Sequence, residues 1–269
     1  MTTTSSGRLL ISHITLRGPE LRQTYTLVAR EPGLTYADLA ERCLAWAEGA
    51  AFGLEEAPLR ESLSFLAGAG MIEQSGQGAR RRLRATPPLP NADFALLLLH
   101  HLWTRRDIRQ RALLLIYQQL AAEPLRSIEL REARQRMEAG PHGSLFAWTG
   151  EKLTFWSQLM EYTGLVRRLS AGTVVCLPRE KLVLRALRAT AESVSRVHGL
   201  AELLDRIDQR FFACFTARSQ VNSGLAQTLV ALHRAGYIRL SHSADAARSL
   251  SLGDWRVSEV TIGPVEAPE

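Results

Sequence analysis

Arginines recur at alternate positions in one short segment of this 269-residue chain, Gly78-Ala79-Arg80-Arg81-Arg82-Leu83-Arg84. The segment follows a glycine-containing turn, and we expect it to form a strand. Side chains alternate across a strand, which places Arg80, Arg82 and Arg84 on the outer face, roughly 6 to 7 Å apart, and Leu83 in the core. Guanidinium groups at this spacing can follow a row of phosphates, and Arg81 adds a fourth candidate. The alternative is an edge strand whose charges prevent aggregation.

Two further groups of residues are candidates for nucleic-acid contact. Arg167 and Arg168 open another expected strand, where they either meet phosphate or keep a sheet edge soluble. The helix expected from 221 to 235 carries groups able to reach base edges on its exposed side. We take these as Asn222, Ser223, Gln227 and Arg234, with Arg239 on the strand that follows.

Catalytic and metal-binding motifs are missing from the sequence, so we expect neither an enzyme nor a bound metal or cofactor. It has no GxxxxGK[ST] loop, no HExxH, no GxSxG and no Cys or His pair at metal-ligand spacing. Ser241, His242 and Asp245 are neighbours on one turn, whereas a working triad is assembled from separate elements. The pair His100-His101 lacks carboxylate or cysteine company, which favours a core or interface role.

The charge balance points weakly to an anionic partner. The net charge is +6, and 31 of the 33 basic residues are arginine, the better bidentate ligand for phosphate. A GC-rich genome explains the same bias, because the arginines are spread along the whole chain. Cys43, Cys176 and Cys214 lie far apart, as expected of reduced core residues in a cytoplasmic protein. The longest apolar run, residues 94–99, is far shorter than the ~20 residues of a membrane helix.

A repeated ending identifies the elements that carry these residues. Three expected helices end in a short spacer, a glycine and a hydrophobic pair: Gly70-Met71-Ile72, Gly164-Leu165-Val166 and Gly236-Tyr237-Ile238. Glycine beyond a helix end permits a left-handed cap, and the pair after it favours a strand. The fold class we expect is therefore α+β, mainly helical with small β-hairpins.

Helices and turns divide the chain into three expected units. The first spans 8–86, with an extended segment at 8–17, helices at 18–30, from Thr35 and from Glu56, and a hairpin. The proline-rich linker 86–91 precedes an apolar helix at 94–103 that we expect to join modules. The second unit spans 91–178. It starts with this apolar helix and contains further helices at 108–122, 128–139 and 151–162 and a hairpin. The third, 179–262, has a connector helix from 180 to 197 and helices at 200–215 and 221–235, which leave no room for a second helix between them.

The order helix, helix, helix, hairpin resembles the winged-helix family of helix-turn-helix modules. The resemblance implies tandem winged-helix modules joined by connector helices. It also implies that the third helix of a module enters the major groove of DNA while the wing, the strand hairpin, contacts phosphate. The third helices of the first two units look unsuited to that role. In the first unit this helix has three acidic residues, Glu55, Glu56 and Glu61, and one basic residue, Arg60. In the second unit it has Glu151 and Glu161 and one basic residue, Lys152.

Two functions therefore remain open. In the first, the chain is a non-enzymatic protein that binds double-stranded DNA mainly through arginine-bearing wings, as a regulator or as a subunit of a larger complex. In the second, the acidic third helices bind protein, and the chain is an interaction scaffold without direct DNA contact. We expect no membrane contact in either case, and both leave homo-oligomer formation open.

Overall fold

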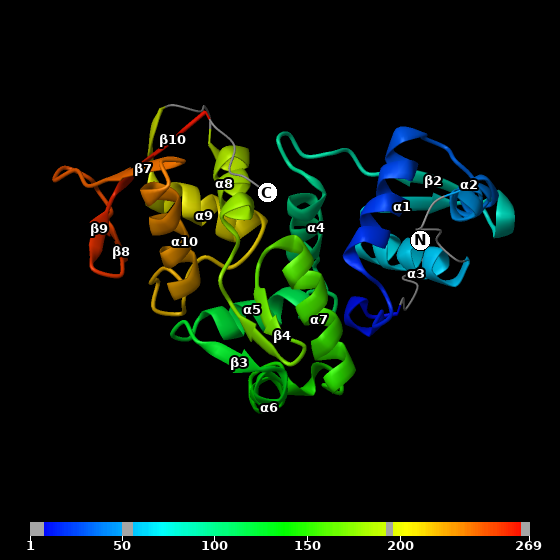
Figure 1. Cartoon of the computed structure of the whole chain (residues 1–269), viewed down its shortest axis with the longest axis horizontal. Helices are drawn as coiled ribbons and strands as arrows, with labels where there is room; N and C mark the ends of the chain where they lie inside the picture. The colour runs from blue at the N-terminus through cyan, green and yellow to red at the C-terminus, as the bar shows by residue number, and fades with distance from the viewer. Residues whose placement is uncertain (1–7, 50–55, 192–195, 265–269) are drawn as a thin grey trace.

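The computed structural model describes residues 8–49, 56–191 and 196–264 and shows an α+β protein, in which helices dominate and the strands form small antiparallel sheets. Figure 1 shows three groups of helices, with α1–α3 on one side, α5–α7 below and α8–α10 on the other side. The helix α4 (Phe94–Trp103) stands between them.

The first group contains α1 (Gly18–Arg30), α2 (Tyr36–Gly49), α3 (Glu56–Ala69) and the hairpin β1 (Ile72–Ser75) and β2 (Arg82–Ala85). Pro19 lies in the first turn of α1, a position that suits proline. The helix ends at Arg30, as the sequence predicted. Thr35 caps α2: its hydroxyl accepts from the backbone N–H of Asp38 at 3.2 Å, and the Asp38 carboxylate accepts from that of Thr35 at 3.1 Å. Thr35 also forms a bridge with Arg82, which adds a third chain segment beside β2.

The extended segment predicted for residues 8–17 is wrong. This segment contains a 3₁₀ turn, η1 (Leu10–Ser12), that contacts α3, α5 and α7 rather than a wing. Leu10 and Ile11 are fully buried, and the backbone N–H of Leu10 donates to Oε1 of Gln110 at 3.1 Å. A compact turn buries both neighbouring apolar side chains, whereas a strand would direct one of them outward.

The second group contains α5 (Ala112–Ala121), β3 (Ser127–Glu129), α6 (Leu130–Ala139), the 3₁₀ turn η3 (Gly143–Leu145), α7 (Gly150–Thr163), β4 (Arg167–Ser170) and β5 (Thr173–Val175). Two predicted helix starts were too early. Residues 108–111 form turns before α5, and residues 127–129 pair with β5 as a strand before α6 begins. The sheet order is β3-β5-β4.

The third group contains α8 (Glu180–Thr190), β6 (Val197–Gly199), α9 (Leu200–Arg210), α10 (Ser223–Arg234), β7 (Ile238–Ser241), β8 (Leu250–Leu252), β9 (Trp255–Val257) and β10 (Glu259–Ile262). Two predicted helices of this group were too long. The connector helix predicted to residue 197 ends at Thr190, where β6 later begins at Val197, and the helix predicted for 200–215 ends at Arg210. Residues 216–220 contain no helix, as the sequence predicted. The residues 192–195 of the predicted connector lie outside the described part. The stretch 243–254 contains β8, which pairs with β9.

All three groups share one topology. The second group runs helix, strand, helix, helix, strand, strand, and the third follows the same order with the β8–β9 hairpin inserted before its last strand. Both three-stranded sheets place the last strand in the centre, as β3-β5-β4 and β6-β10-β7. In the first group the bridge at Thr35 takes the place of the early strand beside β2. The third helix of each group ends alike: Gly70, Gly164 and Gly236 have φ of 78°, 85° and 81°. The predicted left-handed caps are confirmed.

The groups pack around α4, whose Leu96, Leu97, Leu98, Leu99 and Leu102 are all buried. This helix contacts α3, α5, α7, α8 and α9, so it joins all three groups as the sequence predicted. A direct contact also links α1 to α7: a Cβ on Gly18 would lie 2.1 Å from the ring of Tyr162. The absence of a side chain at Gly18 therefore allows the two helices to approach.

None of the helices in the described ranges has both the length and the apolarity to cross a bilayer. Cys43, Cys176 and Cys214 are all buried and unbonded to one another. Burial raises the pKa of Cys176 to about 12, which keeps this thiol protonated and unreactive at neutral pH.

Candidate nucleic-acid interface

A groove of about 540 Å³ runs along the exposed side of α3 and reaches the β1–β2 wing. Arg60 and Ser64 are exposed on the helix, and the small residues Ala67 and Gly68 form the floor after them. The remaining polar lining comes from the wing and from the segments flanking the group: Arg8, Gln74, Arg81, Arg105 and Gln110. Four guanidinium groups thus line one groove beside the third helix.

The acidic character predicted for α3 does not reach this groove. Oε1 of Glu61 lies 2.7 Å from Nη1 of Arg8 and 3.3 Å from Nδ1 of His13, and the Glu61 side chain is only 20% exposed. Its charge is therefore neutralised locally. Glu55 and the side chain of Glu56 lie outside the part that the structure describes. The groove side of α3 carries Arg60 and no described carboxylate.

Arg105 reaches the groove from the segment after α4. Its guanidinium packs over Gly70, where a Cβ would lie 2.6 Å from Nη1. Arg105, Arg106, Arg109 and Arg111 lie in or just before the helix that the sequence predicted for 108–122. Because α5 begins only at Ala112, these residues precede the helix, and Arg111 stacks 4.8 Å above the centre of the Trp103 ring.

The predicted alternation along β2 is confirmed for three residues and wrong for one. Leu83 is fully buried, and Arg82 and Arg84 are exposed. Arg80 is exposed too, but it ends a 3₁₀ turn, η2 (Gly78–Arg80), so it does not continue the outer row of the strand. The turn forms because Gly76 and Gly78, with φ of 85° and 59°, fold the wing tip back before pairing starts.

Arg81 lies on the groove side of the wing. Its Nη1 donates to Oε1 of Gln74 at 2.8 Å, and Nε2 of Gln74 lies 3.4 Å from the carbonyl oxygen of Leu63 on α3. This chain of contacts fixes the guanidinium relative to the helix. The wing therefore presents cations on both faces, with Arg81 toward the groove and Arg82 and Arg84 away from it.

The second wing differs from the first, because its arginines are paired within the protein. Nη2 of Arg167 lies 3.0 Å from both carboxylate oxygens of Glu180, and Nη1 of Arg168 lies 3.7 Å from Oε2 of Glu161. The prediction that these two residues are available to phosphate is not supported by their contacts. The same pairs neutralise Glu161, one of the acids that made α7 look negative.

The helix α10 presents only part of its predicted polar set. Asn222 is 1% exposed, and its Nδ2 donates to the carbonyl oxygen of Ala213 at 2.9 Å, so it stabilises the turn before α10 and cannot read a base. Ser223, Gln227 and Arg234 are exposed and line a groove of about 740 Å³ between α10 and the β8–β9 hairpin. Arg239 is exposed on β7 and does not line that groove.

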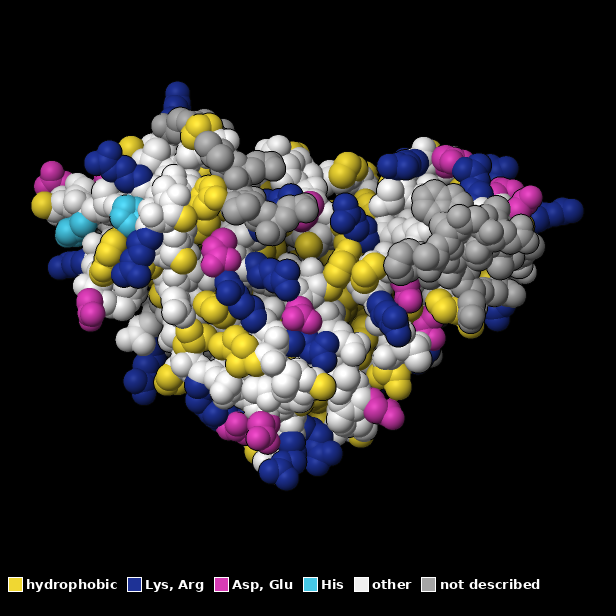
Figure 2. Space-filling model, in the orientation of Figure 1, with side chains coloured by type: hydrophobic (Ala, Val, Ile, Leu, Met, Phe, Trp, Pro, Cys, Tyr) yellow, Lys and Arg dark blue, Asp and Glu magenta, His cyan; other side chains and the backbone are white. Residues whose placement is uncertain are grey.

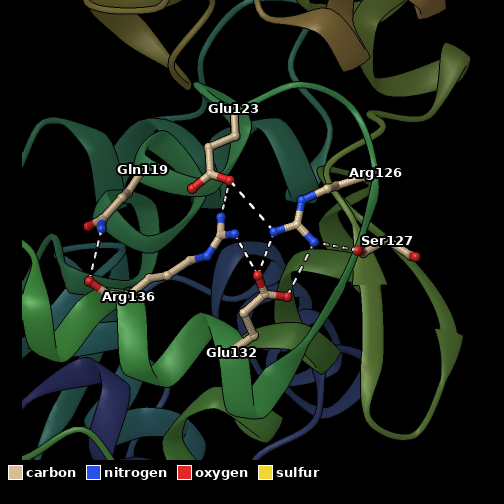
Figure 3. Close-up of polar contacts among 6 residues, drawn as sticks. All are labelled: Gln119, Glu123, Arg126, Ser127, Glu132 and Arg136. Atoms are coloured by element: carbon tan, nitrogen blue, oxygen red, sulfur yellow. Dashed lines mark hydrogen bonds and ion pairs between the residues drawn. The ribbon is translucent and has the colours of Figure 1, made fainter.

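Two arginines of the second group of elements, Arg126 and Arg136, are paired with carboxylates of the protein itself (Figure 3). Nη2 of Arg126 and Nη2 of Arg136 each lie 2.5 Å from Oε1 of Glu132, and Arg136 also pairs with Glu123. Gln119 donates to the carbonyl oxygen of Arg136 at 3.1 Å. The group joins the end of α5 to α6. The strand β3 lies between Arg126 and Glu132 in the chain. The pairing of these two residues therefore depends on how the chain folds at β3.

The histidines and the Ser-His-Asp turn singled out in the sequence make contacts within the fold. No three His, Cys, Asp or Glu side chains within the described ranges are close enough to hold a metal ion. His100 contacts the carbonyl oxygen of Arg210 and His101 contacts Oγ1 of Thr86, so both stabilise α4 against its neighbours. Ser241 contacts Glu259 on the adjacent strand rather than His242.

The arrangement places guanidinium groups from several elements around one exposed helix and one wing. Comparison with protein-family models, with curated proteins and with solved structures gives no significant match for the chain.

Proposed function

We propose that the chain is a non-enzymatic nucleic-acid-binding protein built from three tandem winged-helix modules. The shared topology supports this proposal, because a helix, an early strand, two helices and two final strands, with the last strand central, is the order of a winged helix. In this assignment α3, α7 and α10 are the third helices, and α8 belongs to the third module instead of connecting two modules.

The observation that carries the proposal is the groove on the first module. It combines the exposed side of a third helix with a wing, the two elements that a winged helix applies to duplex DNA. Arg8, Arg60, Arg81 and Arg105 line it, and Arg82 and Arg84 extend the positive surface along the wing. Arg81, Arg105, Arg82 and Arg84 suit phosphate, and the exposed Ser64 is the polar side chain placed to meet a base edge. Arg8 is paired with Glu61, and Gln74 is engaged by Arg81 and Leu63.

Binding to a fluorescently labelled duplex, measured by anisotropy across a series of salt concentrations, tests the proposal. We expect affinity to fall steeply with salt, and the double variant R81A/R105A to weaken binding and to reduce the salt slope by about two. Arg131→Ala is the matched control, because Arg131 is exposed on α6, outside the groove. Absence of binding at low salt would overturn the proposal.

A protein-interaction scaffold is the second candidate, and a specific observation favours it for the other modules. Leu169 at the tip of the second wing is 63% exposed and Val197 is 62% exposed, while the nearby arginines of that wing are paired internally. Apolar side chains beside neutralised charges suit a protein partner better than phosphate. This reading fails if the purified chain binds duplex tightly and retains no protein from its host.

A further inference from the structure

A second cavity, of about 310 Å³, lies where the three modules meet, between α1, α7, α8 and the start of α4. It is separate from the groove on α3 and shares no lining residue with it. Its charged lining consists of Arg22 from α1, Asp93 before α4, and Arg179, Lys181 and Arg185 at the start of α8 and just before it. Figure 2 shows several Lys and Arg side chains, with Asp and Glu among them, over the middle of the face that it draws.

The described lining of this cavity contains more guanidinium groups than carboxylates. Asp93 is the one carboxylate among the described lining residues, and both of its oxygens are already engaged: Oδ1 accepts from the backbone N–H of Leu96 at 2.9 Å, and Oδ2 pairs with Arg185. Within the described ranges neither Arg22 nor Arg179 has an ion pair. The positive charges of these two guanidinium groups therefore favour a bound anion.

Two helix starts add to the same electrostatic field. Phe94 and Ala95 from the first turn of α4 line the cavity, as do Lys181 and Leu182 from the first turn of α8. The backbone N–H groups at a helix start carry partial positive charge and stabilise a nearby anion. The two helix starts and the four cationic side chains therefore favour the same kind of ligand.

Shape and rigidity narrow the chemistry of that ligand. The cavity lies at the lower end of the range of ligand pockets, roughly 300 to 1,000 Å³, and is too small for a duplex. Its wall is rigid, because the Tyr162 ring packs against Gly18 and the backbone N–H of Arg179 donates to the carbonyl oxygen of Gly164 at 2.7 Å. Guanidinium forks on a fixed wall match phosphoryl oxygens better than they match a monatomic anion.

We propose that this junction pocket binds a phosphoryl group, carried by a free phosphorylated metabolite or by the 5′ end of a nucleic-acid strand. Arg22 and Arg179, which have no carboxylate partner within the described ranges, are its principal ligands, and Arg185, held by Asp93, borders the same site. Because the lining comes from all three modules, the bound group links them. The proposal is independent of duplex binding at the α3 groove.

Isothermal titration of the full chain with pyrophosphate, at constant ionic strength, tests the site. We expect saturable binding, weakened roughly tenfold or more in R22A/R179A, since each charge-assisted hydrogen bond contributes about 1.5 to 3 kcal/mol. Arg179→Lys should retain part of the affinity, because it keeps the charge and loses only the fork. Arg131→Ala is the control for net charge. Both arginines are exposed, and circular dichroism will verify that the variants fold.

The second arm of the experiment separates the two sources of the phosphoryl group. A single strand with a 5′ phosphate should bind more tightly than the same strand with a 5′ hydroxyl if the ligand is a strand end, and equally if it is a free metabolite. The absence of pyrophosphate binding together with equal strand affinities would overturn the proposal, as would equal losses in R22A/R179A and Arg131→Ala. The variant R81A/R105A should bind pyrophosphate normally, so failure at one site is distinguishable from failure at the other.

Discussion

Gly224 of α10 packs directly against the backbone of Cys176, so that a Cβ at Gly224 would lie 1.9 Å from the carbonyl oxygen of Cys176. The contact is continued one turn later, where Oγ1 of Thr228 donates to the carbonyl oxygen of Pro178 at 2.7 Å. These contacts hold α10 against the residues that follow β5 in the second group.

Gly224→Ala should therefore destabilise the protein. The added methyl group meets backbone that cannot rotate away, and such overpacking costs about 1 to 3 kcal/mol. Urea unfolding followed by circular dichroism measures the change in the free energy of unfolding. Gly172→Ala is the control, because nothing lies within 4 Å of a Cβ at that position. Equal stability of the two variants would show that α10 does not dock as described.

The two wings should respond differently when their arginines are replaced. We expect R80A/R82A/R84A to weaken duplex binding and to reduce the salt slope by roughly one for each phosphate that is no longer neutralised. We expect R167A/R168A to leave duplex binding unchanged, because these guanidiniums pair with Glu180 and Glu161. Anisotropy titrations at several salt concentrations compare the two. A larger effect from the second wing would reverse our assignment of the contact surface.

Stability should fall on mild acidification. Burial, followed by the charge of Arg8, lowers the pKa of His13 from 6.5 to about 4, against the opposing effect of Glu61. Burial, followed by the charges of His100 and Arg105, lowers the pKa of His101 to about 4. Between pH 6.5 and 4 the unfolded chain therefore binds protons that the folded chain does not, so the free energy of unfolding decreases as the pH falls through this window.

Urea unfolding at about pH 7.5 and about pH 5, on either side of the ordinary histidine pKa, measures this dependence. Replacing His101 with Gln removes one of the two titrating groups, so the difference in stability between the two pH values should shrink. His242→Gln serves as the comparison, since that residue is exposed at the end of a strand. An unchanged difference in His101→Gln would show that His101 does not contribute to the acid sensitivity.

The charge group shown in Figure 3 should contribute modestly and in a salt-dependent way. Glu132→Gln removes the carboxylate that Arg126 and Arg136 share and leaves Glu123 as their remaining carboxylate partner in the group. Because all these groups are partly exposed, we expect a small decrease in Tm that becomes smaller at about 1 M NaCl. A decrease that is large and independent of salt would mean that the group is shielded from solvent.

Local signals in the sequence predicted a good part of the fold. The three glycine caps, both ends of α1 and the cap at Thr35 depend on residues within one or two helical turns, so their patterns are complete in the sequence. The strands β3 and β6 were missed because each has only three residues and is defined by pairing with β5 or β10, far along the chain. Without β6, the three-stranded sheet of the third group could not be recognised.

The candidate interface was predictable only where one element determines it. The alternation of Arg82, Leu83 and Arg84 follows from strand geometry alone. By contrast, the pairing of Arg167 with Glu180 and the burial of Asn222 depend on packing between elements. Arg8 and Arg105, which complete the groove on α3, come from segments before and after the first group of helices. No periodicity places them there.

The burial of α4 has a practical consequence for anyone who wishes to dissect this chain. Its leucines are covered by elements of every group, so cutting the sequence on either side of residues 94–103 removes part of their cover. We expect fragments carrying a single unit to aggregate, because several leucines of α4, or the apolar surfaces that it covers, would then face water. The repeat is a unit of topology, and we expect the smallest piece that folds on its own to be larger than one repeat.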